Sequence, residues 1–98
     1  MEIKNQRYTV QGVDLLELAK EFGTPVFVYD ADKITHQVNR MRGAFEGQSL
    51  KIKYAAKALT NISILKLMNS LGVGLDVVSR QELQLGLKAG YQANEIQF

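Results

Sequence analysis

The sequence alternates between short apolar runs and amphipathic stretches, and this alternation limits the fold more than any other feature. The apolar runs have the length of strands, and the stretches between them repeat apolar residues at helical spacing. The first expected helix is capped by Asp14 and stops at Gly23, and the other expected helices are Ala31–Phe45, Ile62–Leu71 and Ser79 to Ala89. The expected strands are Val26–Tyr29, Leu50–Ala56, Leu75–Val78 and Glu95–Phe98. Short connections between such elements indicate the βα repeat of a parallel sheet. Its right-handed crossovers can close into a barrel or leave the sheet open, and periodicity does not choose between them.

Local residue types support several of these boundaries. Asp14 and Asp30 stand where a carboxylate can accept from the first amides of a helix, and Ser79 with Glu82 matches the capping box. The first helix is expected to gather its apolar residues on one face, and the last to bury Leu83 and Leu87. The residues of that first apolar face are Val13, Leu16, Leu18, Ala19 and Phe22. Before the first helix only Tyr8–Val10 suggests a short strand, and the first twelve residues suggest no chemistry.

Composition excludes several classes of function. The chain has 98 residues with 46% hydrophobic and 22% charged content, as in an ordinary soluble domain. Its net charge is +2 with the basic residues spread along the chain, so neither nucleic acid nor a membrane is an expected partner. No signal peptide opens the sequence and there is no cysteine, which agrees with a cytoplasmic protein. His36 is the only histidine, so we expect it on the surface and expect no metal site.

Lys57 is the candidate for chemistry. Residues alternate along Leu50–Ala56, which places Lys53, Ala55 and Lys57 on one side of the predicted strand. Lys57 then falls at the carboxyl end of that strand, where α/β folds form their active sites. Alanines on both sides leave room for a flat ring, and a partly desolvated amine suits a Schiff base. On this stretch alone, a solvated surface lysine is the commoner case.

Four stretches in order resemble one family. Tyr54-Ala55-Ala56-Lys57-Ala58 is similar to the Tyr-Ala-x-Lys-Ala signature of the fold-type III pyridoxal-phosphate decarboxylases, and most of all to their diaminopimelate decarboxylase branch. The other three stretches are Gly23–Asp30, Leu71–Ser79, and Glu82-Leu83 followed by Ala89-Gly90. The similarity runs from about Leu15 to Phe98. The chain departs from the family at Leu59, usually Asn or Cys, and at Arg80-Gln81, usually a glycine pair, and neither departure touches Lys57.

The resemblance implies an α/β fold that is part of a TIM-type (β/α)8 barrel. Residues 1–30 would be a helix and strand associated with a second β domain, and residues 31–98 the first βα units of the cofactor-binding barrel. Such a barrel needs on the order of 250 residues, so we expect this chain to be an incomplete portion of a longer enzyme and inactive alone. The full-length protein would be a homodimer.

The resemblance also implies a reaction. Lys57 would form the internal aldimine with pyridoxal 5'-phosphate, with Asp76 and Ala55 also at the cofactor. The substrate would be meso-diaminopimelate, decarboxylated to L-lysine in lysine biosynthesis. Three alternatives stay open: a decarboxylase of another basic or polyamine-like amino acid, a noncatalytic barrel protein that carries the cofactor, and a structural βα module without a ligand. The expected strand at Val26–Tyr29 argues against the carrier, because such single-barrel proteins lack a second domain.

Overall fold

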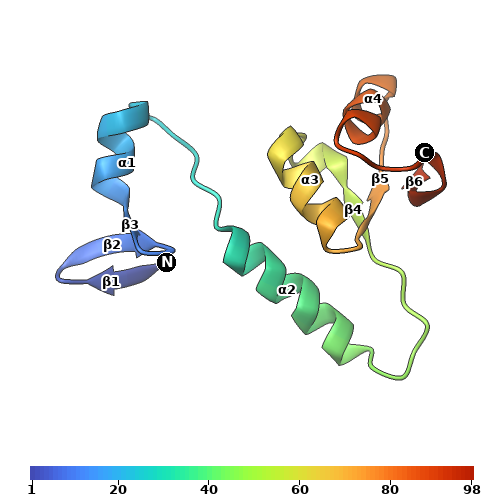
Figure 1. Ribbon diagram of the computed structural model, residues 1–98, viewed down its shortest axis with the longest axis horizontal. Coiled ribbons are helices and arrows are strands. Elements are labelled where there is room, and N and C mark those ends of the chain that lie inside the picture. Colours follow the sequence, from blue (N-terminus) through green and yellow to red (C-terminus); the bar gives the residue numbers. More distant parts are fainter. The chain divides into compact units, whose positions relative to one another are not determined.

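The computed structural model describes residues 1–98, which divide into two compact units, Met1–Asn39 and Arg40–Phe98. Each unit has its own three-stranded sheet (Figure 1). The sheet of the first unit is antiparallel, and that of the second is parallel. No helix in either unit has both the length and the apolar character needed to span a bilayer.

The first unit opens with two tight turns that the sequence analysis missed. Its strands are β1 (Glu2–Lys4), β2 (Arg7–Val10) and β3 (Val13–Asp14), paired in that order. Asn5 and Gln6, between β1 and β2, both have positive φ angles, of 52° and 62°. Two positive φ angles in a two-residue loop define the type I′ turn, which matches the twist of a hairpin. Because glutamine is a weak signal for this turn, the sequence suggested only part of β2.

Helix α1 (Leu15–Phe22) follows β3 directly and confirms the predicted boundaries. Asp14 Oδ1 accepts a hydrogen bond from the Leu16 amide at 2.8 Å, and Gly23 ends the helix with a φ of 83°. The predicted apolar face is not buried, however. Leu16 remains 59% exposed and Phe22 67% exposed, and α1 contains no buried residue.

The expected strand at Val26–Tyr29 is wrong for this structure, which has no strand there. A strand requires a neighbour that supplies ladder hydrogen bonds, and none of this chain's strands pairs with that segment. Asp30 then caps α2 (Ala31–Ala44), as predicted, with Oδ1 accepting from the amides of Asp32 at 3.0 Å and Lys33 at 3.2 Å.

The second unit contains the predicted parallel strands in shorter form. Its elements are β4 (Lys53–Ala55), the 3-10 turn η1 (Ala56–Ala58), α3 (Ile62–Ser70), β5 (Gly74–Asp76), α4 (Arg80–Lys88), a second 3-10 turn η2 (Ala93–Glu95) and β6 (Ile96–Gln97). The strands are parallel in the order β4-β5-β6. Helices α3 and α4 lie beside them and connect each strand to the next, which is the predicted βα repeat (Figure 1).

One face of this sheet packs against both helices and forms the core. Tyr54, Leu75 and Ile96 are register partners and point to that face. The fully or nearly buried members of the core are Ala56, Leu65, Leu75, Val77, Ala89 and Tyr91. Helix and sheet come closest at Gly86, where a Cβ atom would lie 2.5 Å from Leu75 Cδ2.

The buried face of α4 differs from the predicted one. Leu83 is half-buried as expected, but Leu87 is 48% exposed and Gly86 is the buried residue. The apolar periodicity predicted the helix correctly, but the residue that faces the sheet is Gly86 and not its neighbour Leu87. Apolar character favoured Leu87, whereas the close approach to Leu75 selects the residue without a side chain.

Candidate functional site

Lys57 lies in η1, directly after β4, with an exposed side chain. The strand ends at Ala55, earlier than predicted, so Lys57 belongs to a short turn and not to the face of the strand. Its neighbour Ala56 is fully buried and fixes the turn in the core. The amine therefore projects from a rigid support at the carboxyl end of β4, the end that the sequence predicted.

Two hydrogen bonds at Leu59 close the turn that carries Lys57. The Leu59 amide donates to the Ala56 carbonyl at 3.1 Å, and the Tyr54 hydroxyl donates to the Leu59 carbonyl at 2.8 Å. Tyr54 was noted in the sequence only as part of a motif. The signal for its role was its place on the strand, three residues before Lys57 and on the helix-facing side.

Asp76 ends β5 and is the register partner of Ala55. Neighbouring residues in register point to the same face, so Ala55 and Asp76 share the face away from the helices. Both are half-buried, and no hydrogen bond or ion pair engages the Asp76 carboxylate. The structure thus places all three predicted site residues at one edge of the sheet, with Lys57 two residues beyond Ala55.

Asp76 does not cap α4. That helix is capped by Ser79, whose Oγ accepts from the Glu82 amide at 3.1 Å, as predicted. The Glu82 carboxylate accepts from the Val78 amide at 2.7 Å, one residue before the amide that a capping box uses.

Gln97 is a site neighbour that the sequence analysis missed. It is the register partner of Asp76 on β6, and it is exposed on the same face. The strand at Glu95–Phe98 was predicted, so aligning the carboxyl ends of the three strands would have found it.

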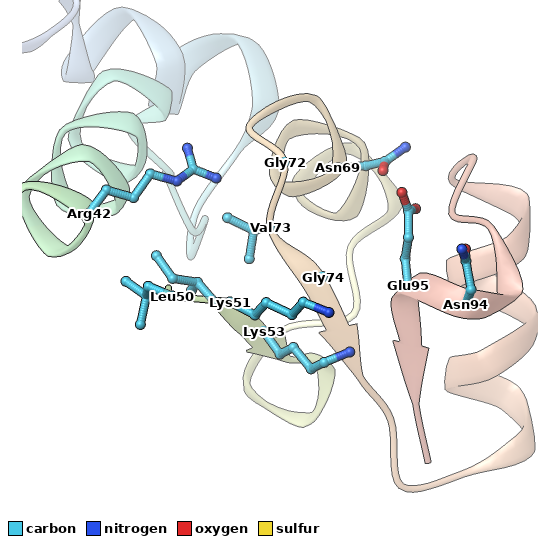
Figure 2. A pocket seen from close by; sticks show the side chains of 11 residues that line it. Arg42, Leu50, Lys51, Lys53, Asn69, Gly72, Val73, Gly74, Asn94 and Glu95 are labelled. Carbon is cyan, nitrogen blue, oxygen red and sulfur yellow. The ribbon is translucent and has the colours of Figure 1, made fainter. Parts of the chain in front are cut away.

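A groove of about 340 Å³ lies at the opposite, amino-terminal edge of the sheet. Figure 2 shows Lys51 and Lys53 at the start of β4, Gly74 at the start of β5 and Glu95 ahead of β6. The Arg42 guanidinium also lines the groove and donates to the Leu71 carbonyl. Because parallel strands share one direction, this groove is separated from Lys57 by the length of the strands.

The groove therefore does not contain the candidate site. No group of three or more histidine, aspartate or glutamate side chains is arranged to hold a metal ion. His36 is exposed on α2, which confirms the prediction of a surface histidine.

Comparison with known families decides what kind of site this is. Residues 31–98 match the model of the pyridoxal-dependent decarboxylase family, pyridoxal binding domain. The chain belongs to this family. The matched residues include Lys57, Asp76 and Ala55, so the whole candidate site lies within the pyridoxal binding domain.

Individual members of the family are similar along almost the entire chain. A diaminopimelate decarboxylase from Staphylococcus aureus is 41% identical over 97 residues, which cover 97% of this chain and 23% of the relative. One from Helicobacter pylori is 44% identical over 82 residues, or 84% of this chain and 20% of the relative. The chain thus spans less than a quarter of the length of these curated relatives.

A solved structure agrees with the fold. The crystal structure of the diaminopimelate decarboxylase from Methanocaldococcus jannaschii in complex with L-lysine superimposes with a TM-score of 0.89 at 37% identity. The match covers 97% of this chain and 23% of that one. The described elements therefore resemble a part of that enzyme's fold.

The residues at the site fit the cofactor of the pyridoxal-dependent decarboxylases. An exposed primary amine is the group that attaches an aldehyde, and Lys57 provides it on a fixed turn. The nearby residues Ala55 and Ala58 have only methyl side chains, which suits a site that must admit a flat ring. Asp76 adds a carboxylate on the same face, which suits a cationic nitrogen nearby.

Proposed function

We propose that this chain supplies the cofactor attachment site of a diaminopimelate decarboxylase, which converts meso-diaminopimelate to L-lysine and carbon dioxide. The observation that carries the proposal is the exposed Lys57 on a fixed turn at the carboxyl edge of a parallel sheet, with Asp76 at the same edge. The names of the relatives with 41% and 44% identity support the choice of substrate. The L-lysine bound to the Methanocaldococcus jannaschii enzyme is the product that this reaction would release.

Each site residue has a role in this proposal. Lys57 Nζ would hold pyridoxal phosphate covalently. Asp76 keeps negative charge near that nitrogen and so favours its protonated form. Ala55 leaves the approach open because its side chain is one methyl group. When bound, the cofactor withdraws electrons from the substrate carbon that loses carbon dioxide.

The proposal extends to the protein around the site. The three parallel strands would be the first strands of a TIM-type barrel, which the resemblance to the family implies and which about 250 residues complete. Residues 1–30 would associate with a second β domain, and the protein would be a cytoplasmic homodimer. The extended apolar segment at Val26–Tyr29 supports the second domain, since it has the composition of a strand and no partner here.

Mapping the attachment site tests the central assignment. The protein is incubated with pyridoxal phosphate, reduced with borohydride and digested, and the modified peptide is sequenced by mass spectrometry. We expect the added mass on Lys57. A label on Lys51 or Lys53, which lie at the other edge of the sheet, would contradict the proposal.

Substrate choice needs a separate measurement. Carbon dioxide release by the full-length enzyme is followed from meso-diaminopimelate and, at equal concentrations, from lysine, ornithine and arginine. We expect release from meso-diaminopimelate alone. Preferred release from ornithine or arginine, with Lys57 still labelled, would favour the alternative of another basic amino acid.

A further inference from the structure

Tyr54 connects the core of the second unit to the turn that carries Lys57. Its half-buried ring packs against the core cluster on the helix-facing side of β4. Its hydroxyl leaves the core and donates to the Leu59 carbonyl at 2.8 Å. The hydrogen bond spans the whole of η1, from the strand before Lys57 to the residue after the turn.

Apart from the buried Ala56, the turn is held by the two hydrogen bonds at Leu59. A 3-10 turn of three residues has poorer hydrogen-bond geometry than an α-helix and is rarely stable alone. Here the Leu59 amide is bonded to Ala56 at 3.1 Å and the Leu59 carbonyl to Tyr54, so both polar groups of this residue are fixed. The Lys57 side chain is exposed and has several rotatable bonds, so the backbone turn sets the position from which that side chain extends.

We propose that Tyr54 is a positioning residue for Lys57, acting through Leu59 and the η1 turn. This inference rests on the proposed function of Lys57 as the cofactor attachment site. The Tyr54 hydroxyl bonds the backbone after the turn and takes no part in the bond to the cofactor. Its effect is to keep the amine at the carboxyl edge of the sheet, the edge where Ala55 and Asp76 lie.

The chain offers a matched control in Tyr91. The Tyr91 hydroxyl donates to the Val73 carbonyl at 2.7 Å, so Tyr91→Phe also removes one bond from a tyrosine to a backbone carbonyl. Tyr91 belongs to the same core cluster as Tyr54. Its acceptor, Val73, precedes β5 at the amino-terminal edge of the sheet, away from Lys57.

The experiment compares Tyr54→Phe, Tyr91→Phe and the unchanged protein. Occupancy of Lys57 is measured by borohydride trapping and peptide mapping over a range of pyridoxal phosphate concentrations. We expect the half-saturating concentration to rise about two- to tenfold in Tyr54→Phe, the effect of losing one neutral hydrogen bond. It should stay unchanged in Tyr91→Phe.

A second readout does not depend on the cofactor. Hydrogen exchange of the Leu59 amide, measured without pyridoxal phosphate, should speed up in Tyr54→Phe and not in Tyr91→Phe, because only the first variant loosens the turn. Equal occupancy curves for the two variants, or unchanged exchange at Leu59, would overturn the positioning role. Absence of label on Lys57 in the unchanged protein would instead overturn the proposed function, so the two failures are distinguishable.

Discussion

The two units are held together by different kinds of interaction. In Arg40–Phe98, six core residues from β5, α3 and the turns and connections around them are buried together, and Leu65 and Leu75 are completely inaccessible. In Met1–Asn39 the buried residues are Thr9 and Val38, while Ile3 and Phe27 are 69% and 87% exposed. Polar contacts are more prominent there, with Arg7 Nη1 only 2.6 Å from Asp14 Oδ2.

The contrast explains why the candidate site lies in the second unit. A reactive lysine needs its backbone fixed to within a fraction of an ångström, and a buried core provides that support. Tight turns and caps define the course of the first unit but fix it less strongly, because exposed ion pairs contribute little. The predictions below test this difference, beginning with the largest expected effect.

Replacing Lys57 with alanine should separate chemistry from stability in the second unit. Because the proposed role of Lys57 is to hold the cofactor, we expect decarboxylation by the full-length enzyme to fall by roughly 1,000-fold or more in Lys57→Ala. The amine is exposed and contributes nothing to the core, so the unfolding transition should not change. Carbon dioxide release and urea unfolding measure the two effects. Lys66→Ala on the exposed side of α3 is the control and should change neither.

Shortening one leucine in each unit compares the two interiors directly. Leu75 is fully buried, so Leu75→Ala should lower the free energy of unfolding by about 2–5 kcal/mol. Leu16 is 59% exposed, and Leu16→Ala should cost about 0.5 kcal/mol or less. Both are measured by urea unfolding. Similar losses for the two variants would mean that the first unit has a buried core after all.

Adding one methyl group to a helix glycine compares a packed and an unpacked position within the second unit, to which both Gly86 and Gly43 belong. Gly86→Ala would drive a Cβ into Leu75 and should destabilise by about 1–3 kcal/mol. A Cβ atom on Gly43 in α2 would have no other atom within 4 Å. Gly43→Ala should therefore stabilise the fold by about 0.5–1 kcal/mol through helix propensity. Thermal unfolding of both variants gives the signs. A neutral Gly86→Ala would show that the interface between α4 and the sheet can relax.

Alkaline pH should weaken the second unit through Tyr91. Burial raises the pKa of the Tyr91 hydroxyl to about 12, with smaller contributions from Glu95 and Tyr54. Because the folded state holds this proton more tightly, the stabilisation is complete below the usual value of 10 and is lost as the pH rises toward 12. When the ultraviolet absorbance of the tyrosines is followed against pH, one tyrosine should ionise at higher pH than the others, and this step should be absent in Tyr91→Phe.

Acid should loosen the first unit, by a smaller amount. The hydrogen bond from Arg7, followed by that from the Leu16 amide, holds the pKa of the Asp14 carboxyl below its usual value of 3.8. A lowered pKa stabilises the fold above that value, and the contribution is lost as the pH falls through the folded-state pKa. The protection factors of amides in β2 and α1, which correct for the intrinsic pH dependence of exchange, should fall on acidification, and Asp14→Asn should remove this fall.

The sequence by itself determined the helices, their first residues and the parallel βα repeat. Asp14, Asp30 and Ser79 cap helices where they were expected to, because a cap depends on amides only two or three residues away. The motif around Lys57 was also local, and it led to the family that residues 31–98 match.

Only the tertiary structure decided where strands end and which side chains face inward. Val26–Tyr29 has the composition of a strand, but a strand exists only where another chain segment supplies its hydrogen bonds. Gly86 is buried and Leu87 exposed because α4 approaches Leu75 closely, which no pattern within α4 records. The turn at Lys57 likewise depends on the Tyr54 hydroxyl, because β4 ends where its pairing with β5 ends and the residues beyond must find other partners.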